Sequence, residues 1–428
     1  MTAALLKLNA RTFASLKRHR NYRLFFTGQL VSVIGTWMQN IALAWLVIEL
    51  TSSPVAVGVL AFCRFAPFTL FGLFAGVLAD RVENRKLVLA TQSFSMAVSA
   101  VLTVVVLTGS ATLWLVYVLA TLGGCALVFD APGRQALTFQ LVGRDELPNA
   151  LALNASLFNA SRIVGPSVAG VLIAAFGVGV CFAINTVSFL AVLTSLLLMR
   201  KEELVPVVQD AEPPSVLRSI GEGLRYARRT PHVRLILAIV TVISTVGFNF
   251  HVILPLLASE TLKTGPEVFG ILSAFFGAGA LVGALLTAAF GRASWKVLVA
   301  GTGGFSLALL MLAPLTAVWA CALLLFVAGA CFTMWTSNAN SILQLGAPDH
   351  LRGRVVSLYL WAFAGLAPIG GLLAGFLTDL GGTRLAFLVS GGTGLLMTLL
   401  AGRELRQRRD AAQRRSVLHR SNMEGMTP

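Results

Sequence analysis

The stretch LTSSPVAVGVL at residues 50–60 recurs 212 residues later as LKTGPEVFGIL at residues 262–272. The shared residues of the first copy are Leu50, Pro54, Gly58 and Leu60. A second repeat, with a spacing of 204 residues, matches Gln140, Leu141, Asp145 and Leu147 to Gln344, Leu345, Asp349 and Leu351. Internal repeats that run in the same direction are typical of transporters built from two similar halves. We therefore predict two related halves with a substrate site between them.

Composition indicates that both halves lie in a membrane. The 428 residues are 56% hydrophobic and 12% charged, whereas a soluble domain carries about 25% charged residues. The long apolar blocks fit helices of about 20 residues that cross a bilayer, and the alternating segments of a β-barrel are absent from the sequence. We predict an all-α polytopic membrane protein with 12 transmembrane helices in two six-helix pseudo-repeats. The predicted spans are 23–48, 54–79, 87–108, 112–132, 149–176, 179–199, 234–258, 267–290, 297–313, 317–341, 355–379 and 384–402.

The polar segments predict the domain division and the orientation. The predicted parts are a cytoplasmic basic segment at 1–22, a six-helix bundle at 23–199, a cytoplasmic linker at 200–233 with a short amphipathic helix near 215–229, a second six-helix bundle at 234–402 and a cytoplasmic basic tail at 403–428. With both termini in the cytoplasm, four of the 33 Lys and Arg residues fall outside cytoplasmic segments: Arg64, Arg162, Lys263 and Arg384. This positive-inside bias predicts a multi-pass protein of the cell inner membrane. It also accounts for the net charge of +15 without a nucleic-acid partner.

The loop between the second and third predicted spans reads GVLADRVENRK, residues 76–86. It resembles the loop signature of the major facilitator superfamily, which has a glycine, then Asp-Arg, then a basic pair. Glu83 departs from that signature, which usually has glycine there. The resemblance implies a major facilitator fold and a gate at this loop. The implied gate residues here are Gly76, Asp80, Arg81, Arg85 and Lys86.

Further motifs are similar to those of one branch of this superfamily, the enterobactin exporters. They include DAPGRQA at 130–136, LPNA at 147–150 and ASRIVGP at 160–166, and also NYR at 21–23, GTWMQ at 35–39 and LTSSP at 50–54. The resemblance runs from about residue 20 to residue 400. It implies efflux from the cytoplasm driven by the proton gradient, with siderophores, macrolides or other drugs as cargo.

The fifth predicted span also resembles the antiporter signature of drug exporters. Gly165, Pro166 and Gly170 fit that signature, whereas Ser161 and Ala169 stand where glycine is usual. We predict a hinge at Gly165 and Pro166, because small residues let helices pack closely and proline weakens a helix. Its counterpart in the second half is Pro368.

Two arginines fall near the middle of predicted spans. Arg64 lies about ten residues into its span and Arg162 about fourteen residues past Pro148, or roughly 15 Å and 21 Å at 1.5 Å per residue. A cation at this depth costs at least about 2.5–3.5 kcal/mol on insertion scales, so it must face a cavity or a partner. One interpretation is that both bind anionic substrate groups such as phenolates or carboxylates. The alternative is an internal partner that holds helices together. The repeat places Phe276 and, approximately, Ala364 at the matching positions of the second half.

Three ionisable residues are candidates for proton coupling. Asp130 lies near the cytoplasmic end of the fourth span, in the same motif as Arg134. The resemblance implies that Asp130 pairs with the basic loop and latches a gate, and the alternative is that it carries the proton. His251 lies inside the seventh span, and its imidazole titrates near neutral pH, although most such histidines only hydrogen-bond to neighbours. Glu49 ends the first span, where the pattern favours an ordinary interfacial carboxylate over a proton carrier.

Polar and aromatic side chains on the central spans supply the remaining candidates for substrate binding. In the superfamily that this chain resembles, the first, fourth, seventh and tenth helices line the cavity, although an aromatic residue on a membrane helix often only packs. The candidates are Gln39, Asn40, Trp37, Asn249, Trp335 and Asn338, with Phe248 as a further aromatic wall.

We predict a monomeric, proton-coupled antiporter in the lipid bilayer that exports a small amphiphilic molecule, without catalytic residues, cofactor or metal. Uptake of a nutrient by the same fold remains the first alternative. The sequence contains no Gly-Lys dipeptide and hence no P-loop for an ATP-driven pump. A membrane enzyme would need converging nucleophile, base or metal ligands, and the five histidines are scattered without an HExxH motif. A membrane sensor or scaffold without flux is the last alternative.

Overall fold

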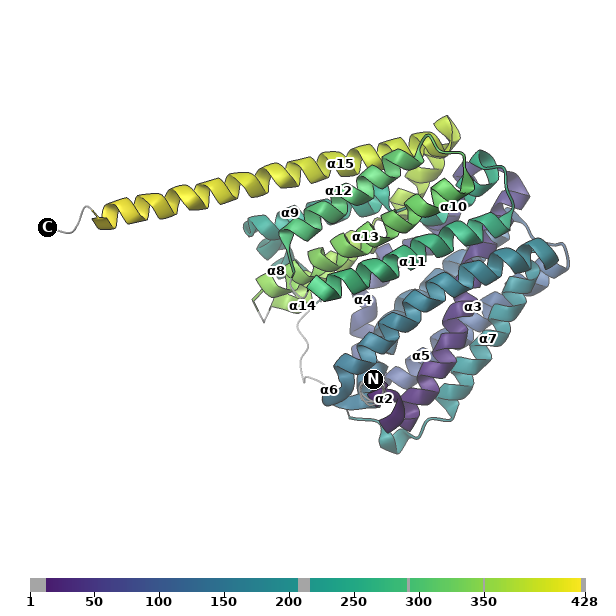
Figure 1. The fold of residues 1–428 in the computed structure, drawn as a ribbon. Coiled ribbons are helices and arrows are strands. Elements are labelled where there is room, and N and C mark those ends of the chain that lie inside the picture. The colour runs from purple at the N-terminus through teal and green to yellow at the C-terminus, as the bar shows by residue number, and fades with distance from the viewer. Residues whose placement is uncertain (1–12, 207–215, 291–292, 349–350, 425–428) are drawn as a thin grey trace, which may run out of the picture.

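The structure, a computed structural model, describes residues 13–206, 216–290, 293–348 and 351–424. Within these ranges the side chains of 73, 76–80, 216–220, 290 and 406–424 are not described. The regular structure in the described ranges is entirely helical, and ten of its helices are long and apolar enough to cross a membrane. Figure 1 shows these helices packed as two groups, one coloured purple to teal and one green to yellow.

The first group contains the helices up to residue 197, followed by a short 3-10 helix. They are α2 (Ala14–Arg18), α3 (Arg20–Thr51), α4 (Pro54–Arg81), α5 (Asn84–Leu107), α6 (Leu113–Phe176), α7 (Gly179–Leu197) and η1 (Lys201–Glu203). The 64-residue helix α6 is bent sharply at Gly143, which has φ 70° and ψ −176°. Only glycine adopts this conformation easily, so Gly143 is where the chain turns back across the bundle.

The second group begins after the linker and ends with the long helix α15. Its elements are α8 (Val216–Arg229), α9 (Pro231–Val242), η2 (Ile243–Gly247), α10 (Phe250–Leu256), η3 (Leu257–Thr261), α11 (Pro266–Phe290), α12 (Trp295–Leu312), α13 (Val318–Gly346), α14 (Arg352–Ala364) and α15 (Ala367–Glu424). Helix α8 coincides with the helix predicted near 215–229. Gly381 and Gly382 interrupt α15. The tenth membrane-capable stretch runs from Arg352 to Leu405 and joins α14 to the first part of α15. If this stretch and α6 each cross the membrane twice, the ten make twelve spans, and that number stays a prediction.

The turns between successive helices lie at two opposite ends of the bundle. The linker end carries Gly143, η1 and α8, and the opposite end carries the turns at Ser52 and Gly177. Helix α15 runs on to Glu424, past the predicted span end at residue 402, and Figure 1 shows it projecting beyond the bundle.

The two halves approach each other backbone to backbone at two helix crossings. At the first crossing, a Cβ on Gly58 of α4 would lie 2.8 Å from the carbonyl oxygen of Gly371 in α15. At the second, a Cβ on Gly270 of α11 would lie 2.5 Å from the carbonyl oxygen of Pro166 in α6. Glycine at such crossings lets membrane helices pack closely. Gly58 and Gly270 occupy the same position of the repeated stretch. In both copies the proline of that stretch begins the helix, where its missing N–H is not needed.

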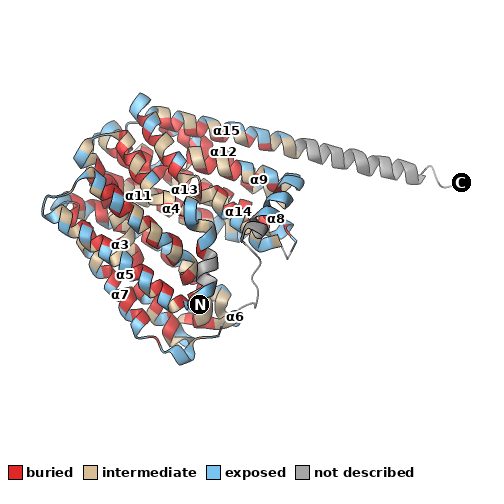
Figure 2. Cartoon of the chain, turned by 180° about the vertical axis from the view of Figure 1, so that it is seen from behind, coloured by how far each residue is buried: buried red, intermediate tan, exposed pale blue. Residues whose placement is uncertain are grey.

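The outer surface of the bundle is apolar. Large side chains such as Leu70, Trp114 and Val171 are 64%, 79% and 63% exposed, and Figure 2 shows exposed residues distributed along the outward faces of the helices. An apolar surface of this extent is stable only against hydrocarbon. The chain is therefore a multi-pass membrane protein with its buried core inside and between the two halves.

Candidate functional site

A central cavity of about 680 Å³ lies between the two halves. Its wall comes from α3, α4, α5 and α6 of the first half and from η2, α10, α11, α14 and α15 of the second. Most of this wall is apolar, with side chains such as Ile41, Leu60, Leu254 and Phe363. A mostly apolar cavity with a few polar groups is typical of small-molecule sites.

The cavity is closed toward the opposite end and extends toward the linker end. Trp45 of α3 and Phe269 of α11 stack with ring centroids 6.5 Å apart, and both are nearly inaccessible to solvent. At the other extreme the wall includes Arg134, Thr138 and Asn154, which lie close in sequence to the bend of α6 at the linker end. A molecule can therefore enter from the linker end.

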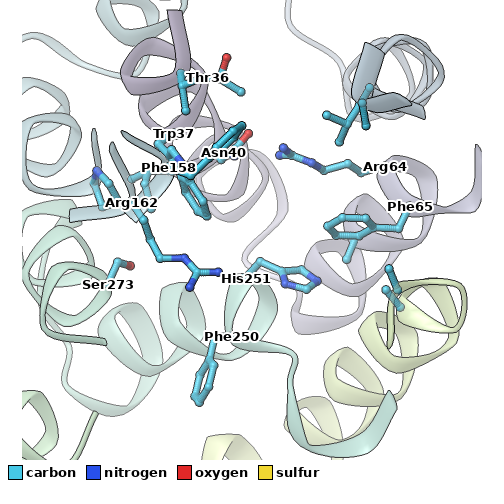
Figure 3. A pocket seen from close by; sticks show the side chains of 18 of the residues that line it. Thr36, Trp37, Asn40, Arg64, Phe65, Phe158, Arg162, Phe250, His251 and Ser273 are labelled. Carbon is cyan, nitrogen blue, oxygen red and sulfur yellow. The ribbon is translucent and has the colours of Figure 1, made fainter. Parts of the chain in front are cut away.

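Arg64 and Arg162 point into this cavity from two different helices of the first half (Figure 3). The guanidinium carbon of Arg64 lies 5.7 Å from the centroid of the Phe65 ring. That of Arg162 lies 5.5 Å from the Trp37 ring and 6.0 Å from the Phe276 ring. Neither guanidinium forms a hydrogen bond or an ion pair with the residues that the structure describes. Both cations therefore face aromatic rings instead of carboxylates.

His251 of α10 brings a polar group from the second half to the same space. In Figure 3 it lies beside the end of the Arg162 side chain, and its ring centroid is 5.0 Å from that of Phe65. Its Nε2 atom is buried and has no hydrogen-bond partner in the described structure. A buried polar atom without a partner is unusual, so Nε2 is an unsatisfied polar atom of a residue in the cavity wall.

Asp130 of α6 lies in the cavity wall, held by side chains from two helices. Its carboxylate accepts hydrogen bonds from Thr91 Oγ1 at 2.9 Å and from Gln92 Nε2 at 2.8 Å. It also forms an ion pair with Arg134, one helical turn away. The Gln29 side chain also bonds to Arg134. When its amide is oriented with the oxygen toward Arg134, that oxygen accepts a hydrogen bond from Arg134 Nε at 3.2 Å. The negative charge of Asp130 is therefore already compensated.

Comparison with known proteins identifies the chain. The model of the transmembrane secretion effector family, a family of major facilitator transporters, matches residues 10–424. The chain belongs to this family. It is 26% identical to the staphyloferrin A transporter of Staphylococcus aureus strain NCTC 8325 over 88% of this chain and 94% of that protein. It is 25% identical to macrolide efflux protein A of Streptococcus pyogenes over 88% of this chain and 95% of that protein.

The fold agrees with this assignment. A crystal structure of a POT family transporter in complex with 5-aminolevulinic acid superimposes with a TM-score of 0.74 at 12% sequence identity, covering 89% of this chain and 95% of that one. At this identity the likeness shows the fold alone. The chain is therefore a transporter with the major facilitator fold, as the sequence motifs predicted.

The loop signature of this transporter is described only in part. The side chains of Gly76 and Asp80 lie outside the described residues. Arg85 Nε donates to the carbonyl oxygen of Leu196 at 2.8 Å, and Lys86 pairs with Glu83 at 2.7 Å. Lys86 donates a hydrogen bond to the Glu83 carboxylate in this pair, and this bond is the main reason why the pKa of Glu83 lies below its usual value.

The predicted pairing of Asp130 with the basic loop is therefore wrong in this conformation. Arg81 is exposed, Arg85 bonds to the end of α7, and Arg134 takes their place beside Asp130. The physical reason is distance along the chain. Asp130 and Arg134 are four residues apart and therefore lie on the same side of α6, whereas the loop between α4 and α5 would have to reach across to α6.

Three of the predicted amide residues hydrogen-bond to other residues of the protein and do not line the cavity. Gln39 Oε1 accepts from Ser99 Oγ at 2.8 Å and from Asn185 Nδ2 at 2.7 Å, which joins α3 to α5 and α7. Asn338 Oδ1 accepts from the backbone N–H of Ser294 at 2.9 Å, where α12 begins. Asn249 Nδ2 donates to the carbonyl oxygen of Thr245 at 2.7 Å, beside the break before α10. Asn40, next to Gln39, does line the cavity.

Two further candidates also lie apart from the cavity. Trp335 is fully buried and packs edge-on against Phe332, with ring centroids 5.8 Å apart. Glu49 is exposed near the end of α3. By contrast, Trp37 and Phe248 are part of the cavity wall.

The hinge residues differ between the halves. A Cβ on Gly165 would lie 2.5 Å from Trp37 Cβ, so this glycine lets α6 cross α3 closely. The helix continues through Pro166, because Gly143 is the residue of α6 with non-helical dihedral angles. Pro368 instead lies in the first turn of α15, just after a break that separates α14 from α15.

Several wall residues were not among the predicted binding residues. They are Phe158, Ser244, Ser273, Phe276 and Phe363. Phe276 and Ala364 are the repeat counterparts of the arginine positions, and both line the cavity. The repeat had already placed Phe276 opposite Arg64 in the sequence, although Phe276 was not then named as a binding residue. The other residues carry no comparable signal in the sequence.

Proposed function

We propose that this transporter exports a small amphiphilic molecule, a siderophore or a drug, across the bacterial inner membrane by proton antiport and alternating access. The observation that carries the proposal is the central cavity, which is lined by both halves and closed on one side by Trp45 and Phe269. The similarity to the staphyloferrin A transporter and to macrolide efflux protein A also supports the proposal.

The orientation follows from the charges at the two ends. Arg18, Arg20, Lys86 and Arg200 lie at the linker end among many other cations, whereas the opposite end holds Lys263 and Arg384. The positive-inside rule assigns the basic end to the cytoplasm. The cavity then opens to the cytoplasm, both termini are cytoplasmic, and residues 23–199 and 234–402 are the two moving bundles of a monomer.

Proton coupling would use the titratable groups of the cavity wall. Asp130 and His251 are the candidates that line it. Glu49 is a weaker candidate, because it lies near the end of α3 and outside the cavity. Protonation of Asp130 would release Arg134, and protonation of His251 would add charge beside Arg64. Either event changes the electrostatics of the wall without a cofactor.

Accumulation in an efflux-deficient bacterial host tests the proposal. The host is given a panel of drugs and catecholate compounds, with and without a protonophore, and the amount of folded protein in the membrane is measured. Lower accumulation of a compound, abolished by the protonophore, is the expected result. Higher accumulation would indicate uptake. No change for any compound, in cells that contain folded protein, would contradict export, and binding without flux in liposomes would indicate a sensor.

A further inference from the structure

We propose that the cargo of the central cavity is a dianion, with two separated anionic groups on an apolar body, one bound by Arg64 and the other by Arg162. The proposal rests on the proposed export function and narrows its substrate class. It excludes amphiphilic cations as preferred cargo.

The cavity wall carries positive charge that no described residue of the wall compensates. The ionisable side chains that line the cavity are Arg64, Asp130, Arg134, Arg162 and His251. Asp130 is the one carboxylate among the described lining residues, and Arg134, Thr91 and Gln92 already bond to it. The guanidinium groups of Arg64 and Arg162 are thus two positive charges for which the wall supplies no counter-charge.

The aromatic neighbours of the two arginines do not replace a carboxylate. A ring face attracts a cation through its quadrupole, whereas a carboxylate offers opposite charge and two acceptor oxygens to the guanidinium fork. Phe65 and Trp37 lie 5.7 Å and 5.5 Å from the guanidinium carbons. These rings screen the arginines from hydrocarbon and leave their N–H donors free for an anion.

The two cations are held apart by the fold. Arg64 comes from α4 and Arg162 from α6, and each guanidinium has its own ring neighbours. Figure 3 shows the two side chains entering the cavity from different helices. One carboxylate can therefore compensate one arginine, and a second anionic group is needed for the other. The rest of the cavity wall is mostly apolar, with Ile41 and Leu254 among its residues, and it fits a hydrophobic body that connects the two groups.

His251 adds a contact from the second half. Its buried Nε2 has no partner in the described structure, and Figure 3 shows the imidazole beside the end of the Arg162 side chain. An anionic oxygen of the cargo that is bound to an arginine would also accept a hydrogen bond from the imidazole when Nε2 carries the proton. The cargo would then bond to both halves at once, so that its binding favours their closure.

Binding to the purified full-length protein in detergent tests the proposal without requiring transport. The probes are 4,4′-biphenyldicarboxylate and the terphenyl dicarboxylate, each with its monomethyl and dimethyl ester, and a biphenyl bis-ammonium compound of matched length. We expect the better-fitting diacid to bind at least about tenfold more tightly than its monoester, which corresponds to about 1.4 kcal/mol. The diester and the bis-ammonium compound should bind most weakly. Equal affinity of diacid and diester for both lengths would overturn the proposal.

Variants assign the effect to the two arginines. Arg64→Gln and Arg162→Gln replace the guanidinium by a neutral amide, and each should reduce the preference for diacid over monoester to less than about twofold. Arg384→Ala is the matched control, because Arg384 is exposed and outside the cavity, and it should bind like the wild type. A preserved preference in both Gln variants would contradict the proposal. The wild-type ester series remains decisive if a variant does not fold.

The outcomes separate this proposal from export itself. Tight binding of the diacid without any change in cellular accumulation would support the dianion site and contradict export. Export of cationic dyes together with equal binding of diacid and diester would support export and contradict the dianion site.

Discussion

Glu222 of α8 forms an ion pair with Arg354 of α14 at the linker end of the second half. The first half has an ion pair at the corresponding place, between Arg18 of α2 and Glu146 of α6, with the two charges exchanged. In each half a short helix that precedes the first long helix is attached to the start of the fifth predicted span. These attachments hold α6 just after its bend at Gly143 and α14 near its start, and both helices contribute to the cavity wall.

Exchanging the charges tests the attachment in the second half. Glu222→Arg or Arg354→Glu alone places like charges together, and we expect a loss of about 1 kcal/mol in stability, at the upper end for partly exposed pairs. The double variant restores an attraction and should recover most of the loss. Thermal unfolding of the purified protein measures it. A double variant as unstable as the sum of the two single variants would show that the pair is not the cause.

The crossing of α6 and α11 should tolerate no side chain at Gly270. In Gly270→Val the added atoms meet the carbonyl oxygen of Pro166, which lies 2.5 Å from the position of a Cβ. Overpacking of this kind costs about 1–3 kcal/mol, and we expect a lower unfolding temperature and slower transport. Gly123→Ala is the control, because a Cβ there has no neighbour within 4 Å. Equal behaviour of both variants would contradict the close crossing.

Removal of the charge at Asp130 should destabilise the first half. Asp130→Asn leaves Arg134 without its ion-pair partner, and breaking a buried pair costs about 3–5 kcal/mol. Asp130→Asn combined with Arg134→Gln removes both charges and should be more stable than Asp130→Asn alone. Thermal unfolding measures both. If the double variant is the less stable of the two, the pair does not explain the effect.

The same variant distinguishes a latch from a proton carrier. If Asp130 carries the proton, the Asp130→Asn/Arg134→Gln protein should exchange cargo across liposomes at equal concentration but fail to accumulate it against a gradient. If Asp130 serves only in a latch, exchange and accumulation should fall together. Transport in liposomes, with and without an imposed pH gradient, measures both.

Two adjacent residues of α3 should respond in opposite ways. Gln39→Leu removes the acceptor of Ser99 and Asn185, and leaving those donors unsatisfied costs about 1–3 kcal/mol. Asn40→Leu should leave stability unchanged, because Asn40 lines the cavity, and should alter the KM for cargo. Unfolding temperature and transport kinetics are measured for both. A stability loss confined to Asn40→Leu would contradict the assigned orientation of α3.

This pair also shows how far the sequence could predict the site. Counting residues at 1.5 Å each predicts a mid-membrane depth for Arg64 and Arg162, which stays a prediction. It also predicts that each faces either a cavity or an internal partner, and the structure places both in the cavity wall. Which face of a helix meets the cavity depends on its rotation against its neighbours. Gln39 and Asn40 differ by about 100° around α3, and their surroundings are equally apolar in sequence, so the pattern could not separate them.

Partners within the site were harder to predict than the fold. The repeat, the apolar spans and the motifs indicated the major facilitator fold, because each is a property of the chain itself. The partner of Asp130 depends instead on how far the loop after α4 lies from α6 in three dimensions. The break at Phe248 and Asn249 follows the π-helical turn η2, and no proline marks that turn in the sequence.

That break makes the two halves mechanically different. Helix α3 is continuous from Arg20 to Thr51, whereas residues 231–261 pass through two π-helical turns and one interruption. A continuous helix transmits a displacement along its full length, and an interrupted one can bend where its hydrogen-bond ladder is broken. Helix α3 can therefore move only as one piece, whereas the helix of residues 231–261 can change direction at its break. A bend there would let one end of the second half move while the other end stays in place.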